Sequence, residues 1–202
     1  MKFIDLYNRF YEYPLLDKRE VKKIYPDVDS RRFYEWQQKG YLKKIANNFY
    51  IFPNKKITDA ELKFISNKLY EPSYISLEMA LSIHSLIPES VFVFTGVSTR
   101  RTKKISNDLG NFHYRKIKNE LFFGFNIVSK QGINYKIAEP EKALLDFLYL
   151  RSDIKDKKDL EELRINPYVY KEDLNRDKLE RYLNLFRSRT LNSKINKLNK
   201  IL

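Results

Sequence analysis

The stretch DKREVKKIYPDVDSRRFYEWQQKG, residues 17–40, decides how the first part of the chain folds. Asp17 is a favourable N-cap for a short helix, and Pro26 ends that helix because the residue before a proline avoids helical backbone angles. After a turn, Asp29 or Ser30 can cap another helix, which ends at a glycine suited to a left-handed exit. The stretch therefore predicts two helices joined by a short turn.

The segments on either side of this stretch extend the pattern. Residues 2–11 carry apolar side chains at helical spacing, which predicts an amphipathic helix. Residues 41–45 and 48–52 predict two strands around a turn. Helix, helix, turn, helix and hairpin is the order of a winged helix-turn-helix, in which the third helix enters the major groove. We therefore expect a DNA-binding domain over residues 1–53.

This arrangement gives polar residues of the third helix and the hairpin a role at DNA. Arginine and glutamine have the donor geometry for base edges, whereas lysine and asparagine suit phosphates. The residues that we expect at DNA are Arg31, Arg32, Tyr34, Gln38, Lys39, Lys43, Lys44, Asn47 and Asn48. Phe33 and Trp36 share the other face of the helix and are expected in the core. The alternatives are a module that docks on another protein, and a helix whose charged outer face is only solvated.

The charge of the chain supports a polyanionic partner. Its 202 residues include 39 Lys and Arg but only 26 Asp and Glu, which gives a formal net charge of +13. The excess is spread along the chain and does not form a detachable basic tail. Such a field favours nucleic acid or an acidic protein. The alternative is the Lys- and Asn-rich composition that an AT-rich genome produces.

Several classes of function are excluded or disfavoured by what the sequence lacks. There is no cysteine, and the five glycines are too far apart for a phosphate-binding loop. The two histidines have no metal-site spacing. We therefore expect neither an enzyme nor a cofactor or metal site. An acid at Asp5 comes too early for a signal peptide, and no stretch is apolar enough to span a membrane, so we expect a cytoplasmic protein with no membrane partner.

The rest of the chain, residues 54–202, predicts an α+β domain with a small, mainly antiparallel sheet and a helical tail from about residue 153. The expected strands cover residues 91–95, 112–117, 121–128 and 135–138, and a basic loop covers residues 98–104. The expected helices cover residues 58–69, a segment from Ser76 to just before Pro88, and residues 140–150, 176–186 and 191–202.

Motifs in this second part resemble those of a known family. They are YISLEMALSIHSLIPE at 74–89, VFVFT at 91–95, GNFHY at 110–114, LFFGF at 121–125 and IAEPEKALLDFLYL at 137–150. Together they resemble the AbiEi-type antitoxins, the antitoxin half of an abortive-infection toxin–antitoxin pair. The first part, with PDVDSRR at 26–32, is similar to the winged helix of that family.

The resemblance implies two activities. The first domain would repress its own operon by binding inverted repeats in the double-stranded DNA upstream, where a dimer can form. The second would neutralise a nucleotidyltransferase-like toxin, directly or indirectly. Residues 35–38, EWQQ, depart from the more basic and aliphatic third helix of the family, so the operator sequence cannot be transferred. On this interpretation, removing residues 1–52 abolishes repression and leaves neutralisation intact.

Charged side chains of the second domain are the candidates for contacting the toxin or a nucleic acid. They are Glu78, Arg100, Arg101, Lys103, Lys104, Glu141 and Lys142. A solvated basic loop and ordinary residues of a helix start are the alternatives for these groups. The alternative for the whole protein is a plain winged-helix regulator whose second domain dimerises or senses a ligand.

Overall fold

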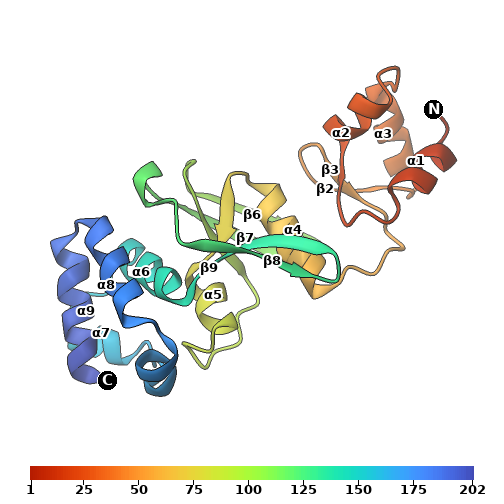
Figure 1. Cartoon of the computed structure of the whole chain (residues 1–202). Coiled ribbons are helices and arrows are strands. Elements are labelled where there is room, and N and C mark those ends of the chain that lie inside the picture. Colours follow the sequence, from red (N-terminus) through yellow and green to blue (C-terminus); the bar gives the residue numbers. More distant parts are fainter.

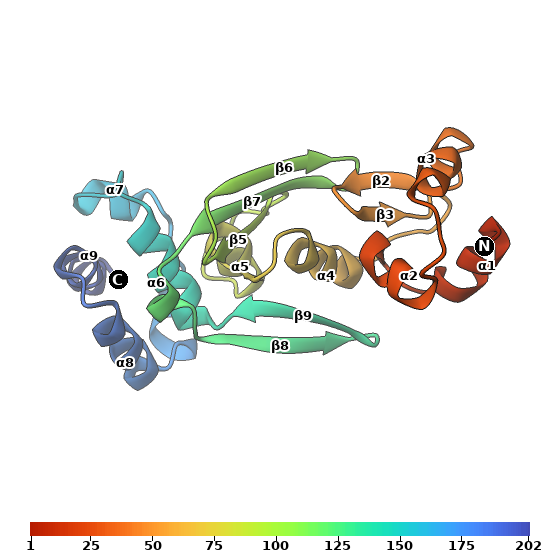
Figure 2. The same cartoon turned by 90° about the horizontal axis from the view of Figure 1, so that it is seen from above.

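A computed structural model describes residues 1–202 and shows an elongated molecule with its two termini at opposite ends (Figures 1 and 2). The helices are α1 Phe3–Phe10, α2 Lys18–Ile24, α3 Ser30–Gln38, α4 Asp59–Leu69, α5 Leu77–Ile83, α6 Pro140–Leu150, α7 Lys157–Glu161, α8 Arg176–Phe186 and α9 Arg189–Ile201. The strands are β1 Leu16–Asp17, β2 Lys43–Ala46, β3 Phe49–Ile51, β4 Ser73–Ile75, β5 Phe94–Ser98, β6 Lys103–Asn107, β7 Gly110–Lys116, β8 Phe125–Lys130 and β9 Ile133–Ala138. A 3₁₀ turn covers Asn119–Leu121, and a π-helical turn covers Val169–Asp173.

The first 52 residues, here called the N-terminal unit, fold around a core of their own. Helices α1, α2 and α3 pack on an antiparallel sheet of order β1-β3-β2. The Asp17 and Asp29 carboxylates each accept a hydrogen bond from the backbone N–H two residues later, at 2.8 Å. Gly40 has φ +70°, the left-handed exit that other residues adopt only with strain. The helix boundaries expected from the caps are therefore confirmed.

Residues 54–202, the C-terminal unit, contain a six-stranded mixed sheet of order β6-β7-β5-β4-β9-β8. Three of its pairings are antiparallel and two are parallel, so the α+β class is confirmed but the sheet is larger and more mixed than expected. Strand β4 has only three residues, which are too few to show the alternation of apolar and polar residues that predicts a strand. Strand β6 reads KKISN, and lysine, serine and asparagine are poor strand formers, so its first residues were expected in a loop. Pairing with β7 overrides that preference.

Some expected boundaries are also wrong. The strand expected at 91–95 lies at 94–98, and the one expected at 121–128 begins only at Phe125, after the 3₁₀ turn. Helix α5 ends at Ile83, well before Pro88. Ser76 does not cap it, because its hydroxyl is used elsewhere in the core.

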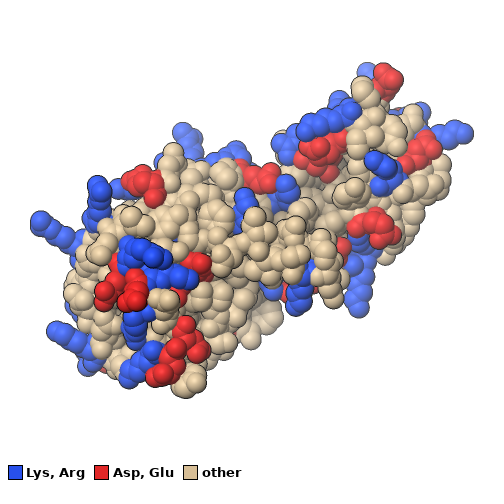
Figure 3. Space-filling model, in the orientation of Figure 1, with Lys and Arg blue, Asp and Glu red and all other residues tan.

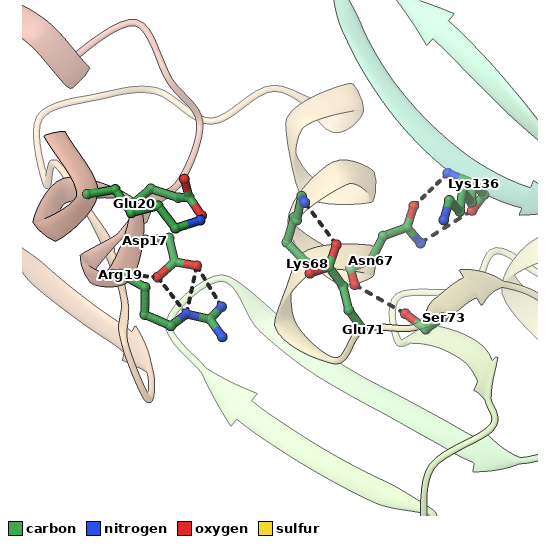
Figure 4. A network of polar contacts seen from close by, with 9 residues as sticks. Asp17, Arg19, Glu20, Asn67, Lys68, Glu71, Ser73 and Lys136 are labelled. Carbon is green, nitrogen blue, oxygen red and sulfur yellow. Dashed lines mark hydrogen bonds and ion pairs between the residues drawn. The ribbon is translucent and has the colours of Figure 1, made fainter.

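Helix α4 lies between the two long hairpins β6–β7 and β8–β9, as Figure 2 shows. The Asn67 side chain donates to the Lys136 carbonyl at 3.3 Å and accepts from the Lys136 N–H at 2.6 Å, so it binds β9 as another strand would. The Ser73 hydroxyl donates to the Asn67 carbonyl at 3.2 Å (Figure 4). On the other hairpin, the Tyr114 hydroxyl donates to the Ser66 carbonyl at 2.5 Å. These bonds fix α4 to both halves of the sheet.

The N-terminal and C-terminal units share a third apolar cluster, here called the junction. Its buried members are Ile45, Phe49, Ile51, Ile65, Leu69, Tyr70, Phe112 and Tyr114. Polar contacts surround it: the Asn107 side chain donates to the Ile45 carbonyl at 3.0 Å, and Lys55 forms an ion pair with Glu61 at 3.2 Å. The β2–β3 hairpin thereby meets the tip of the β6–β7 hairpin (Figure 2). Because the units share buried apolar side chains, we expect them to hold a fixed relative position.

An ion pair lies at the centre of the C-terminal unit. The side chains of Lys142 and Asp146, one turn apart on α6, are fully buried and bonded to each other. Tyr74 and Ser76, which lie two residues apart and so on one face of the chain, both donate to Asp146 Oδ2 at 2.9 Å. The Lys142 ammonium also donates to the Tyr74 hydroxyl at 2.9 Å. Burial raises the pKa of Asp146 and lowers the pKa of Lys142, so each group depends on the other to stay charged.

Breaking this pair should be costly. We expect Lys142→Met and Asp146→Asn each to lower the free energy of unfolding by about 3–5 kcal/mol, because each leaves a buried charge alone. The double variant should lose less than the sum, because it removes both charges and leaves neither buried without a partner. Urea unfolding of the four proteins measures this coupling. Additive losses would show that the two side chains act independently.

The Asn67 contact gives a smaller prediction. Asn67→Ala leaves both backbone groups of Lys136 without their partner, so we expect a loss of about 1–3 kcal/mol in unfolding free energy. Lys68→Ala on the same helix is the control, because its ion pair with Glu71 is largely exposed and should contribute under about 1 kcal/mol. Equal losses for the two variants would contradict this role of Asn67.

Candidate nucleic-acid interface and basic cleft

Helix α3 presents one polar stripe to solvent. Arg31, Tyr34 and Gln38 are exposed and recur at intervals of three and four residues, which places them on one face. Tyr34 is 63% exposed. Phe33 and Trp36 are buried on the other face, as expected, and anchor the helix in the N-terminal core. The stripe is therefore held rigidly and is free to contact a partner.

The other candidates on this helix lie at the edge of the stripe. Arg32 is exposed, but its guanidinium forms an ion pair with the Glu35 carboxylate at 3.1 Å. Lys39 is exposed at the C-cap position. Neither residue is on the line through Arg31, Tyr34 and Gln38, so they suit contacts beside a groove better than contacts inside it.

A cluster of three lysines lies beside the start of α3. The Lys18 ammonium is 5.3 Å from the centre of the Phe33 ring. Partial burial, and the nearby charges of Lys22 and Lys44, lower the pKa of Lys18. The cluster joins α2 to the hairpin and extends the cationic surface of α3. Sequence reasoning missed Lys18 and Lys22, because α2 has five charged residues among seven and no pattern shows which of them face the hairpin.

Strand alternation separates the two hairpin lysines that were predicted at DNA. Lys44 lies opposite Tyr50, on the side of α2 and α3. Lys43 lies opposite Ile51, on the side of the C-terminal unit, and forms an ion pair with Asp108. Only Lys44 therefore belongs to the basic face of the N-terminal unit.

The turn of the hairpin is anchored on both sides. Asn48 adopts φ +66°, and its carbonyl accepts a hydrogen bond from the Lys18 N–H at 2.8 Å. The Ile45 carbonyl, on the other side, accepts from Asn107 of the C-terminal unit. The hairpin is thus part of the junction, and Asn47 stays exposed at its turn.

Three candidates of the C-terminal unit surround one aromatic ring. The Arg100 guanidinium and the Lys103 ammonium lie 4.6 and 5.2 Å from the centre of the Tyr70 ring. The Tyr70 hydroxyl donates to the Arg101 carbonyl at 2.7 Å, and Arg100 donates to the Glu71 carbonyl at 3.1 Å. The segment expected as a basic loop is therefore ordered by contacts with the end of α4.

The next residue, Lys104, lies opposite His113 on the other face of the sheet. There it lines a cleft of about 180 Å³ between β6, β7, the start of α5 and the end of α6, here called the basic cleft. Glu78, another predicted residue, lies in the same cleft together with Arg115 and Arg151. Sequence reasoning missed His113, Arg115 and Arg151, because only the folding of four elements brings them together.

The charges in the basic cleft are unequally paired. The Arg151 guanidinium lies 3.6 Å from the Glu78 carboxylate, and Arg115 donates to the Leu150 carbonyl at 3.0 Å. Lys104 and Arg115 have no carboxylate partner. Partial burial and the charge of Lys104 lower the pKa of His113, against the opposing effect of Glu78, which favours the neutral imidazole. The cleft therefore offers uncompensated cations and a neutral hydrogen-bond donor.

Two predicted residues are removed from the candidate surface by burial. Glu141 and Lys142 are 3% and 0% exposed. The Glu141 carboxylate accepts from the Asn175 N–H at 2.8 Å, and Lys142 belongs to the central ion pair. The expectation that they contact a toxin or a nucleic acid is wrong for the folded chain, because α8 and the sheet cover the first turn of α6.

No family model and no curated protein matches this chain. None of its helices has the length and apolar character needed to cross a lipid bilayer. The positive side chains are distributed over both ends of the visible face, with acidic side chains among them (Figure 3). Function must therefore be argued from the local arrangement of charges and not from overall charge or relatives.

Proposed function

We propose that this protein is an antitoxin of the AbiEi type that also represses its own operon by binding double-stranded DNA. The observation that carries the DNA-binding part is the exposed stripe Arg31, Tyr34 and Gln38, flanked by a lysine cluster. The order α1-β1-α2-α3-β2-β3 in the N-terminal unit supports a winged helix-turn-helix. In such a domain α3 enters the major groove.

The chemistry of the stripe suits base recognition. An arginine can bind guanine with two hydrogen bonds, and a glutamine can bind adenine in the same way. Lys18, Lys22 and Lys44 would contact the phosphates beside the groove, where counterion release provides affinity without sequence preference. Inverted repeats in the operator would accommodate two copies of the chain.

The antitoxin part of the proposal concerns the C-terminal unit. Arg100 and Lys103 place their charges around the Tyr70 ring, and the Arg101 carbonyl accepts from the Tyr70 hydroxyl, which forms an ordered cationic surface of the kind that an acidic toxin surface would fit. The motifs at 74–89 and 137–150, which resemble the family most specifically, fold around the central ion pair. The partner would be a toxin that resembles nucleotidyltransferases.

Variants of the N-terminal unit test DNA binding. We expect Arg31→Ala to weaken binding to the upstream operator by about 1–3 kcal/mol while random DNA is bound nearly as before. Lys44→Ala should weaken binding to operator and random DNA alike. It should also lower the slope of log affinity against log salt concentration by about one. Fluorescence anisotropy across a salt series measures both effects. Lys43→Ala is the matched control and should have the smaller effect, because Lys43 faces Asp108.

One result would contradict base recognition by α3: an equal loss on operator and random DNA for Arg31→Ala. Arg32→Ala provides a second comparison. Its ion pair with Glu35 and its place beside the stripe predict a smaller loss of specificity than for Arg31→Ala.

The two activities should separate in cells. We expect Arg31→Ala to lose repression of a reporter under the operator while it still neutralises the co-expressed toxin, because the changed side chain is remote from the C-terminal unit. Deleting residues 1–52 is a poor test, since it exposes Ile65 and Phe112 of the junction. Loss of both activities in a variant that melts like the wild type would contradict the division of labour. A wild-type chain that represses but never neutralises would instead favour a plain regulator.

A further inference from the structure

The basic cleft collects charge from four elements that are far apart in the sequence. Glu78 comes from α5, Lys104 from β6, His113 and Arg115 from β7, and Arg151 from the residue after α6. Of the four Lys and Arg residues that line the cleft, Lys104 and Arg115 reach into it without a carboxylate partner, and Lys103 lies at its edge. Elsewhere in the chain many lysines and arginines have an acid beside them, as Lys43, Lys55 and Lys63 do. The cleft is therefore a concave site with excess positive charge.

We propose that the basic cleft binds the phosphate group of a phosphate monoester. Lys104 and Arg115 would provide charge-assisted hydrogen bonds to the phosphate oxygens, and the imidazole of His113 would donate one more. Arg151 would complete the cationic wall, oriented by Glu78 on one side and by its hydrogen bonds with Asp153 at 2.6–3.0 Å on the other.

The size of the cleft restricts the ligand. Sites that enclose a whole drug-sized molecule have volumes of about 300–1,000 Å³, so a cleft of about 180 Å³ can take a phosphate but not a complete nucleotide. The rest of the ligand must project into solvent. Such a ligand is either a small phosphate monoester, such as a mononucleotide, or the phosphorylated end of a nucleic-acid strand.

This inference goes beyond the proposed function, and it concerns a different surface. The basic cleft lies in the C-terminal unit, on the face of β6–β7 opposite to Tyr70 and α4. The proposed DNA-binding surface, here called the DNA face, is formed by α2, α3 and β2. A failure of phosphate binding would therefore leave DNA binding untested, and a failure of DNA binding would leave the cleft untested.

Isothermal titration calorimetry of the full chain at physiological ionic strength tests the proposal. The probes are inorganic phosphate, adenosine 5′-monophosphate and, as the control without phosphate, adenosine. We expect saturable binding of the two phosphate-bearing probes and none of adenosine. Lys104→Gln should lower their affinity about tenfold or more, the size expected when a hydrogen bond to a charged group is lost.

The neighbouring residue provides the matched control. Lys103→Gln removes the same charge from the same strand. Lys103 also borders the cleft, but its ammonium lies 5.2 Å from the centre of the Tyr70 ring, on the other face of the sheet. Its loss should reduce the affinity much less than the loss of Lys104. Both residues are exposed, so both variants should fold, which thermal unfolding verifies.

A second arm distinguishes the two sources of the phosphate. Oligonucleotides with and without a 5′-phosphate are titrated into a chain that carries Arg31→Ala and Lys44→Ala, which weakens the DNA face. Tighter, Lys104-dependent binding of the phosphorylated strand identifies a strand end, and equal binding of both strands identifies a small monoester. The proposal is overturned if no phosphate-bearing probe shows Lys104-dependent binding, or if Lys103→Gln and Lys104→Gln reduce affinity equally.

Discussion

The buried ion pair between Lys142 and Asp146 is the constraint on which the C-terminal unit depends. A charge can be buried only if an opposite charge and hydrogen bonds compensate for the lost water, and here both side chains are fully buried. Tyr74 and Ser76 complete the shell of Asp146. Because Tyr74 lies in β4 and Ser76 lies between β4 and α5, the ion pair fixes α6 against the middle of the sheet. It thereby also sets where the end of α6 and the start of α5 meet, which is where the basic cleft forms.

The β6–β7 hairpin connects the two candidate surfaces. Its tip contacts the β2–β3 hairpin through the junction, and its middle provides Lys104 and His113 to the basic cleft. A displacement of these two strands would therefore move the base of the DNA face and one wall of the cleft together. The hairpin is a rigid element that both surfaces share, and such an element is a better physical reason for coupling than closeness in space. Through the same junction, the N-terminal unit shares part of its apolar core with the C-terminal unit.

Local signals in the sequence predict the helices well, and long-range pairing explains most of the errors. The Asp17 and Asp29 carboxylates each accept a hydrogen bond from a backbone N–H only two residues later, so these helix caps can be predicted from the local sequence. Strand β6 exists only because β7 pairs with it, and the basic cleft needs residues from positions 78 to 151. Lys142 was expected to contact a toxin or a nucleic acid, with an ordinary role at a helix start as the alternative. The signal that it is buried was present: Lys142 and Asp146 are one turn apart on a helix that is otherwise apolar over residues 143–150.

Net charge alone would not have distinguished the two surfaces, since +13 is spread over the whole chain. What distinguishes them is the pairing of the charges. Burial and the charges of Lys22 and Lys44 lower the pKa of Lys18, against the opposing charge of Asp29, and none of the three lysines forms an ion pair. Like charges held close together oppose folding, which supports the proposal that this surface binds an anion. The same argument applies to Lys104 and Arg115. Phosphate is the anion proposed at both places, on a DNA duplex at one surface and on a phosphate monoester at the other.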